Sequence, residues 1–219
     1  MGDPVIIVVG AGPGLGAAVA RRFGRAGYAV ALISRGEQQL EQLGAELQAD
    51  GITTGWSAVD ITDGPALRAA VERFAGFSGR IDQVHFNPSL FREKGPLELT
   101  TDELLGDVRL GAASLLDVVQ AARPHMTSGG RVTATGSMAA DQPWHRAASL
   151  GVQKAALRNL VQSIDAAMRD DGIRAASLTV NGTLGEGTPF DAGLVADALY
   201  AASVRPDDDW TSEVAFDGG

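Results

Sequence analysis

Residues 5–16 read Val5-Ile-Ile-Val-Val-Gly-Ala-Gly-Pro-Gly-Leu-Gly16, an apolar run followed directly by a glycine-rich turn. The run has the length of a buried strand, and helical periodicity begins at Ala17. Glycine allows a tight turn and a close approach of a pyrophosphate to the backbone, and the first turn of the helix offers free N–H groups. Because a strand precedes the turn and a helix follows it, we favour dinucleotide binding over an ordinary tight turn. The residues expected to contact the dinucleotide here are Gly10, Gly12, Pro13, Gly14, Leu15 and Gly16.

The rest of the chain also alternates between apolar runs and segments of helical periodicity. Strands are predicted over Val5–Val9, Ala29–Ile33, Thr53–Val59, Ile81–Phe86, Val132–Thr135, Ala175–Val180 and Glu213–Phe216. Helices are predicted over Ala17–Ala26, Glu37–Gln48, Ala66–Ala75, Asp102–Arg123, Ala147–Met168 and Leu194–Ala202. Strands that alternate with helices imply right-handed crossovers and a mostly parallel sheet. We therefore predict a single dinucleotide-binding domain over residues 1–219, an α/β fold with a doubly wound (Rossmann-like) parallel sheet of about seven strands and helices on both faces.

Composition narrows the classes of function. The chain has 219 residues, 27 Asp and Glu against 18 Lys and Arg, and a formal net charge of −9. This acidic balance argues against a nucleic-acid-binding protein, which usually has a basic face. The apolar run Val5–Val9 is far shorter than the roughly 20 residues that span a membrane, so no membrane association is expected. The absence of Cys excludes disulfides and thiolate metal sites and suits a reducing compartment, so we expect a cytoplasmic protein without a metal.

The glycine spacing G-x-x-x-G-x-G at Gly10, Gly14 and Gly16 resembles that of the short-chain dehydrogenase/reductase family. The resemblance extends over nearly the whole chain. It is carried further by Asp60-Ile61, Phe86-Asn87-Pro88-Ser89, Gly130-Arg-Val, Ser137, Lys154-Ala-Ala-Leu and the tail Thr211–Gly219. It implies a nicotinamide cofactor, with Asp60 and Ile61 at the adenine and Asn87 beside the cofactor.

The end of the second predicted strand bears on which nicotinamide cofactor is bound. In this fold an acidic residue there binds the 2′-hydroxyl of NAD, whereas an Arg accommodates the 2′-phosphate of NADP. The strand ends in Ser34-Arg35, and the nearest acidic residue, Glu37, already belongs to the following helix. A solvated Arg at a helix start is the alternative for Arg35. We expect Ser34 and Arg35 to contact NADP(H), and NAD is the less favoured cofactor.

The catalytic positions of the family are only partly present. The resemblance implies that Ser137 orients the substrate oxygen and that Lys154 holds the nicotinamide ribose. The family's proton-donating Tyr lies four residues before the Lys, where this chain has Leu150, and its Asn on the preceding long helix falls at Arg109. The chain has 16 Arg but only two Lys, so a Lys at position 154 stands out. The alternatives are a surface Lys and, for Ser137, a turn residue.

No other side chain is an obvious replacement for the missing proton donor. Tyr28 and Tyr200 are placed elsewhere in the predicted fold. Arg146 lies one helical turn before Leu150 but hardly gives up a proton, and His145 lies off that face. His85 is mid-strand, and we interpret it as a buried histidine with its hydrogen bonds satisfied rather than as a catalytic group.

The segment after the sixth predicted strand is also short. The family usually has Pro-Gly there and then a helical segment that covers the substrate, whereas this chain reads Val180-Asn-Gly-Thr-Leu184 and its last helix begins soon after. Thr188 resembles a Thr that contacts the cofactor. An open site makes a weaker catalyst of ordinary carbonyl reduction, because water weakens electrostatic interactions.

Two main functions follow, and the sequence leaves both open. The first is an NADP(H)-dependent oxidoreductase of this family with a degenerate active site, which acts on a conjugated alkene, imine or quinone-like substrate. The second is a non-catalytic NADP(H)-binding protein, a sensor or a partner subunit; a lyase or isomerase is a weaker third. The substrate is a small molecule that the sequence does not identify. The two long helices form the main dimer interface in the family, so we expect a homodimer or homotetramer.

Overall fold

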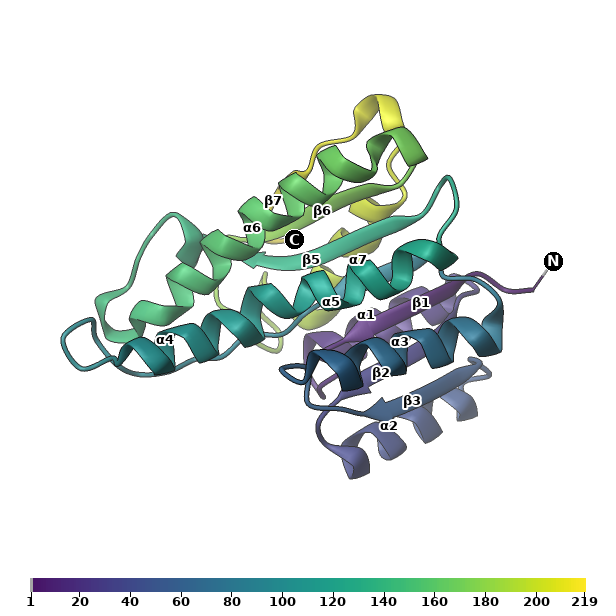
Figure 1. The fold of residues 1–219 in the computed structure, drawn as a ribbon, viewed down its shortest axis with the longest axis horizontal. Coiled ribbons are helices and arrows are strands. Elements are labelled where there is room, and N and C mark those ends of the chain that lie inside the picture. Colours follow the sequence, from purple (N-terminus) through teal and green to yellow (C-terminus); the bar gives the residue numbers. More distant parts are fainter. Residues whose placement is uncertain (1) are drawn as a thin grey trace.

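The sheet consists of short strands that all run in the same direction. In the computed structural model, which describes residues 2–219, every neighbouring pair is parallel and the order is β3-β2-β1-β4-β5-β6-β7 (Figure 1). The strands are β1 (Val5–Val9), β2 (Ala29–Ser34), β3 (Thr54–Ala58), β4 (Gln83–Phe86), β5 (Arg131–Ser137), β6 (Arg174–Val180) and β7 (Glu213–Phe216). All five residues of β1 are buried, as expected for a strand that is covered on both faces.

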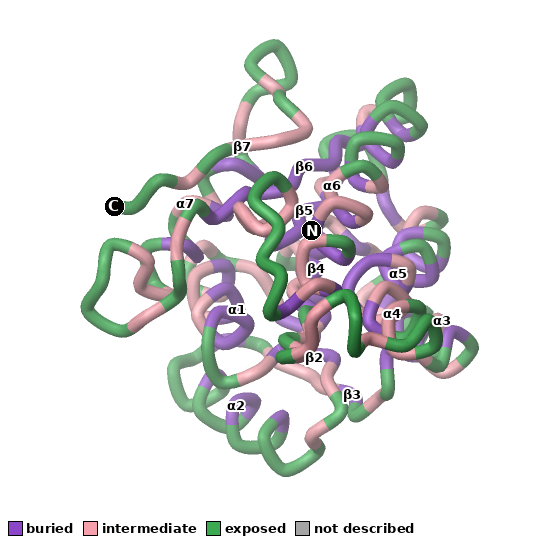
Figure 2. Tube along the Cα trace, turned by 90° about the vertical axis from the view of Figure 1, so that its left-hand side faces the viewer, coloured by how far each residue is buried: buried purple, intermediate pink, exposed green. Residues whose placement is uncertain are grey.

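Helices pack against both faces of this sheet. Helices α1 (Leu15–Arg25), α2 (Glu37–Ala49) and α7 (Ala192–Ser203) bury their apolar residues against Ile6, Val8 and Leu32 on one face. Helices α3 (Gly64–Ser78), α5 (Ser114–Ala122) and α6 (Ala148–Met168) do so against Ile7 and Phe86 on the other. Figure 2 shows the buried residues gathered between the two layers. The predicted doubly wound α/β fold is therefore confirmed.

The structure contradicts one predicted helix. The expected continuous helix Asp102–Arg123 is divided into α4 (Thr101–Val108), a π-helical turn (Arg109–Ala113) and α5. The Ser114 hydroxyl lies 2.7 Å from the carbonyl oxygen of Arg109 and so compensates for the wider turn. The predicted capping box at the start of α4 is present, because Thr100 accepts from the Glu103 backbone and Glu103 from the Thr100 backbone. The other predicted elements agree within a few residues at each end, which is where helix ends are least sharply defined.

The direction of the connections reverses between β1 and β4. The chain proceeds from β1 to β2 and β3 on one side, then returns to β4 and continues to β7 on the other. In open parallel sheets, ligands bind outside the carboxyl ends of the strands at such a reversal. Among residues 2–219, no helix combines the length and the apolar character needed to cross a membrane.

Candidate functional site

A cavity of about 1070 Å³ lies at this reversal, outside the carboxyl ends of β1, β2, β4, β5 and β6. This volume slightly exceeds the roughly 300–1,000 Å³ typical of small-molecule sites, so the cavity has room for a large ligand. Many residues predicted from the sequence come together in its lining. They are Gly10, Gly12, Gly14, Leu15, Gly16, Ser34, Arg35, Ile61, Asn87, Ser137, Leu150 and Lys154.

Three residues predicted to contact the cofactor do not line the cavity: Pro13, Asp60 and Thr188. The carboxylate of Asp60 accepts hydrogen bonds from the backbone N–H and hydroxyl of Thr62, at 2.9 and 2.7 Å, and these bonds lower the pKa of Asp60. The hydroxyl of Thr188 donates to the Gly185 carbonyl at 2.8 Å. Both side chains are thus engaged in local turns, and Thr183 lines the cavity instead of Thr188.

The glycine turn leaves space on its cavity side. Gly10 has a φ of +82°, and a Cβ on Gly16 would lie 2.5 Å from the Gly10 carbonyl oxygen, so both positions require glycine. Around Gly12 and Gly14, by contrast, nothing lies within 4 Å of where a Cβ would be. Helix α1 begins here without a side-chain cap. The turn therefore offers free N–H groups beside an open space, which suits an anionic group such as a pyrophosphate.

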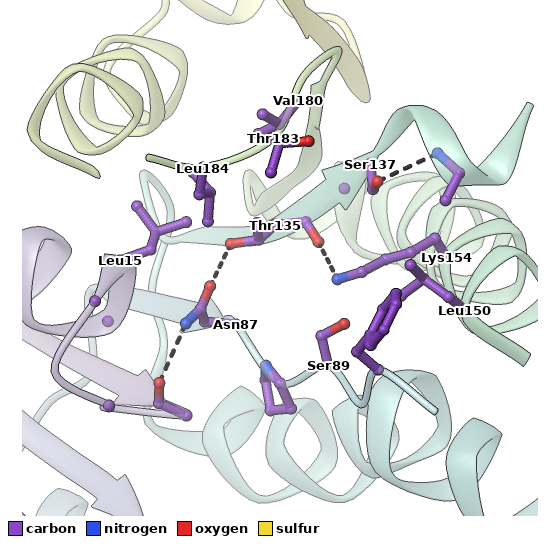
Figure 3. Close-up of a pocket in the computed structure, with 18 of the residues that line it drawn as sticks. Leu15, Asn87, Ser89, Thr135, Ser137, Leu150, Lys154, Val180, Thr183 and Leu184 are labelled. Atoms are coloured by element: carbon purple, nitrogen blue, oxygen red, sulfur yellow. Dashed lines mark hydrogen bonds between the residues drawn. The ribbon is translucent and has the colours of Figure 1, made fainter. Parts of the chain in front are cut away.

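A chain of hydrogen bonds joins this turn to β4, β5 and α6 (Figure 3). The Asn87 amide donates to the Gly10 carbonyl at 3.2 Å and accepts from the Thr135 hydroxyl at 2.8 Å. The Lys154 ammonium donates to the Thr135 carbonyl at 2.8 Å. These bonds hold the carboxyl ends of β4 and β5 and the Lys154 side chain in one arrangement around the cavity.

Lys154 is the buried cation of this site. It is 4% exposed, and burial lowers the pKa of its ammonium group to about 8. At neutral pH the group is still mostly charged, and its single protein hydrogen bond leaves two donors free. Leu150 lies one turn earlier on α6 and presents only methyl groups to the cavity. Ser137, at the end of β5, accepts from the Ala139 N–H at 3.2 Å, and its own proton has no protein acceptor among residues 2–219.

The histidines and the arginine considered as replacements for the missing proton donor do not line the cavity. His85 is fully buried between Thr133 and Thr135, at 3.0 and 3.3 Å, and burial lowers its pKa to about 3, so it is the satisfied core histidine that was predicted. His145 is exposed and does not line the cavity, and Arg146 pairs with Glu93 on the surface.

The two tyrosines of the chain, Tyr28 and Tyr200, are also far from the site. Each makes edge contacts with Phe23, at 5.3 and 5.2 Å between ring centroids, on the α1 and α7 side of the sheet. Arg109 likewise points away from the cavity. Its guanidinium donates to the Thr62 carbonyl and pairs with Asp117 at 2.8 Å, and its neighbour Leu110 lines the cavity instead.

The charge of the cavity differs from that of the whole chain. Its lining contains Arg35 and Lys154 but no Asp or Glu, although the chain has a net charge of −9. Among residues 2–219, no carboxylate pairs with Arg35, whose side chain lies at the mouth of the cavity. A concave, locally cationic surface on an acidic protein favours an anionic ligand.

Several lining residues were not identified from the sequence as site residues. They are Ser89, Phe91, Gln142, Trp144 and Thr183. Ser89 falls in the segment 86–89 that the family resemblance had marked. Phe91 and Trp144 are separated by more than fifty positions and carry no sequence signal that would pair them, yet their rings lie 5.9 Å apart.

Comparisons with known proteins show the family and the fold. The family model described as short chain dehydrogenase matches residues 4–189. An uncharacterized oxidoreductase of Staphylococcus epidermidis is 24% identical and matches over 93% of this chain and 92% of its own. A short chain dehydrogenase of Pseudocercospora fijiensis is 29% identical over 91% of this chain and 64% of its own. A metagenomic short-chain oxidoreductase, solved in complex with NADP, has a TM-score of 0.88 at 24% identity, over 97% of this chain and 96% of the other.

Proposed function

Because the chain belongs to the short-chain dehydrogenase family, we propose that it binds NADP(H) in this cavity and reduces a small substrate whose accepted charge is delocalised. The observation that carries the proposal is the charge of the lining, which has two cations and no carboxylate. The family uses nicotinamide cofactors, and the pyrophosphate of such a cofactor matches the open space along Gly12 and Gly14. The related structure that holds NADP supports the same assignment by analogy.

The preference for NADP(H) over NAD(H) rests on Ser34 and Arg35. Arg35 follows the carboxyl end of β2 and has a guanidinium free to pair with a 2′-phosphate. A 2′-hydroxyl would instead call for an acidic partner, and the lining contains none. The 2′-hydroxyl of NAD(H) would therefore find no acidic acceptor in this site, whereas the 2′-phosphate of NADP(H) would form an ion pair with Arg35.

Each residue near the reacting centre then has a distinct role. When bound, the reduced nicotinamide would supply a hydride to an electrophilic carbon of the substrate. The Lys154 ammonium, which has two donors free, would bind the ribose hydroxyls and favour negative charge nearby. The Ser137 hydroxyl would donate to the substrate oxygen. Leu150 supplies no proton, so the site lacks a contribution of about 10²–10⁴-fold that a positioned acid gives.

This lack of an acid decides the class of substrate. Hydride addition to a simple ketone leaves a localised alkoxide that needs a proton at once. In a conjugated alkene or a quinone the two electrons enter a delocalised system, and the proton can come from water. An imine avoids the need for an acid when it binds already protonated, because hydride addition to an iminium ion gives a neutral amine. Access for water is available, because no helix covers the cavity between β6 and α7 in residues 2–219. We therefore propose a reductase with a degenerate active site for such acceptors.

The second candidate is a protein that binds NADP(H) without turnover. Leu150 at the cavity wall and the short segment 181–191 between β6 and α7 favour it. As a sensor or partner subunit it would use the same cofactor contacts and no substrate.

Both candidates are tested by one set of measurements. NADPH and NADH are titrated while the fluorescence of the nicotinamide is followed, and NADPH oxidation is then measured with a ketone, an enone and a quinone. Tight binding of NADPH with turnover of the enone or quinone but not the ketone supports the reductase. Binding without turnover supports the second candidate, and no binding of either cofactor refutes both.

We expect Arg35→Ala to weaken NADPH binding about 10- to 100-fold, since a hydrogen-bonded ion pair contributes about 1.5–3 kcal/mol. NADH binding should change little, because NADH has no 2′-phosphate. Arg25→Ala is the control, since Arg25 lies at the far end of α1 and does not line the cavity. An equal loss of both cofactors in Arg35→Ala would contradict the assignment.

A further inference from the structure

Two aromatic rings form a platform at one end of the cavity. Phe91 comes from the segment after β4 and Trp144 from the segment before α6, and both line the cavity. Their centroids are 5.9 Å apart, with a tilt of 33° between the planes. Phe91 is 56% exposed and Trp144 45%, so neither side chain is buried by the rest of the protein. Large exposed aromatic side chains that adjoin a cavity are typical of a binding surface.

The lining residues that flank the two rings in sequence are uncharged, and Lys154 is the charged residue that lines the cavity on this side of the sheet reversal. The lining residues after β4 and between β5 and α6 are apolar or neutral, and Arg35 lies on the other side of the sheet reversal. The nearest guanidinium, that of Arg146, lies 5.5 Å from the Trp144 ring but is already paired with Glu93 and does not line the cavity. A carboxylate placed here would lose water without gaining a charged partner, which is unfavourable.

The segment that carries Phe91 is held firmly. The Gln153 amide, which is fully buried, donates to the Leu90 carbonyl at 3.0 Å and accepts from the Leu90 N–H at 3.2 Å. Arg92 makes two bonds to the buried Asp107 carboxylate, at 2.9 and 2.8 Å. Phe91 therefore lies between two anchored neighbours, which preorganises its ring for binding.

We propose that the substrate of this protein carries an uncharged, flat aromatic ring, which binds against Phe91 and Trp144 and places the rest of the molecule toward Lys154. This inference rests on the proposed function for the site, and it adds the class of substrate. An aromatic enone and an aromatic quinone satisfy both requirements, because each combines a flat uncharged ring with a delocalised electron acceptor.

The test measures binding of two matched uncharged probes, 2-naphthol and its saturated, non-planar counterpart decahydro-2-naphthol, by calorimetry. It uses the full chain both alone and saturated with NADP⁺, so that the ring site is assessed independently of the cofactor. We expect 2-naphthol to bind about two- to tenfold more tightly than decahydro-2-naphthol, because a saturated ring system cannot stack on Phe91 and Trp144. Phe91→Leu and Trp144→Leu should each weaken 2-naphthol binding about two- to tenfold and leave NADPH binding unchanged.

A second cavity, of about 520 Å³, includes Trp56, Phe74 and Phe77 in its lining and provides the control. Phe77→Leu should leave 2-naphthol binding unchanged. A loss of binding in Phe77→Leu but not in Phe91→Leu would place the ring in the second cavity and overturn the inference. Equal or tighter binding of decahydro-2-naphthol, or no binding of 2-naphthol with NADP⁺ bound, would overturn it as well and leave the proposed function intact. Failure of NADP⁺ to bind would refute the proposed function, while the probe measurements on the chain alone would still decide the ring site.

Discussion

Single residues decide the chemistry of this site, and Lys154 shows how burial and function oppose each other. Its ammonium is 4% exposed, and among residues 2–219 it has one hydrogen-bond partner and no carboxylate partner. Burial penalises the charged form, which is why its pKa is lowered to about 8. The protein therefore keeps an unfavourable charge in the place where a cofactor ribose would use it.

The first prediction at this scale concerns Lys154→Met. The pKa of Lys154 is about 8 in the folded chain, against an ordinary value of 10.5. Between these two pH values the unfolded chain binds more protons than the folded chain. The free energy of unfolding therefore rises with pH across this window. Below pH 8 the buried charge lowers the free energy of unfolding by up to about 3 kcal/mol, since each pKa unit corresponds to about 1.4 kcal/mol. Lys154→Met should therefore be more stable than the wild type at pH 7, and the difference should shrink toward about pH 10, as measured by urea unfolding.

The same substitution should weaken cofactor binding. In the wild type the dissociation constant of NADPH should rise as the pH passes about 8 and the ammonium loses its proton. Lys154→Met should bind more weakly and show no such rise. A less stable Lys154→Met, or an unchanged pH profile, would contradict the role assigned to this charge.

A second prediction concerns Leu150. Leu150→Tyr places a phenol on the cavity wall, one helical turn from Lys154, and should raise kcat for ketone reduction by about 10²–10⁴-fold, the usual contribution of a positioned acid. NADPH oxidation with a ketone is the measurement. Leu150→Phe fills a similar volume without a hydroxyl and should give no gain. Equal rates for the two variants would show that another group limits the reaction.

At the scale of elements, the π-helical turn between α4 and α5 is tied to the site through Gly111. A Cβ on Gly111 would lie 2.3 Å from the Gln153 side-chain oxygen, the atom that accepts from the Leu90 N–H. The turn and its glycine therefore make room for the amide that anchors the segment carrying Phe91. The helical periodicity of residues 102–123 could not reveal this, because the wider turn is set by contacts with α6 and with Ser114.

Gly111→Ala should lower the free energy of unfolding by about 1–3 kcal/mol, because the Gln153 amide must move and leave the buried Leu90 groups without partners. Gly106→Ala is the matched control five residues away. Nothing lies within 4 Å of a Cβ on Gly106, so alanine there should raise stability by up to about 1 kcal/mol. Chemical unfolding of both variants is the test, and a stabilised Gly111→Ala would show that Gln153 does not need this space.

At the scale of the whole molecule, exposed apolar residues mark one side of the α4, α5 and α6 layer. Leu105, Leu116 and Val152 are 60%, 40% and 46% exposed on α4, α5 and α6 respectively. The family resemblance assigns the dimer interface to these helices, and exposed apolar residues are expected at such an interface. We propose that the protein is a homodimer or homotetramer through this surface.

The test is the mass in solution by light scattering. The double variant Leu116→Glu, Val152→Glu should dissociate the wild-type oligomer, because four or more carboxylates would be buried at a symmetric interface. Phe77→Glu changes an exposed apolar residue on α3, outside this surface, and should leave the mass unchanged. A monomeric wild-type protein would refute the proposal.

The sequence by itself determined the order of strands and helices, the glycine turn and the types of residue available to the site. These follow from local periodicity and from the conformations that glycine permits, so residues 5–16 and the alternation that follows them were sufficient. Leu150 near Lys154 was also visible from the sequence, because one helical turn separates the two residues.

Only the tertiary structure decided what those residues do together. It engaged the Asp60 carboxylate in a local turn with Thr62 and left Arg35 without a carboxylate partner. It also buried His85 and brought Phe91 beside Trp144. It also divided the long helix at Gly111 so that Gln153 could hold Leu90. Each of these outcomes depends on groups that are far apart in the chain, and no local pattern specifies which distant groups will meet, because packing of the whole sheet and its two helical layers sets those distances.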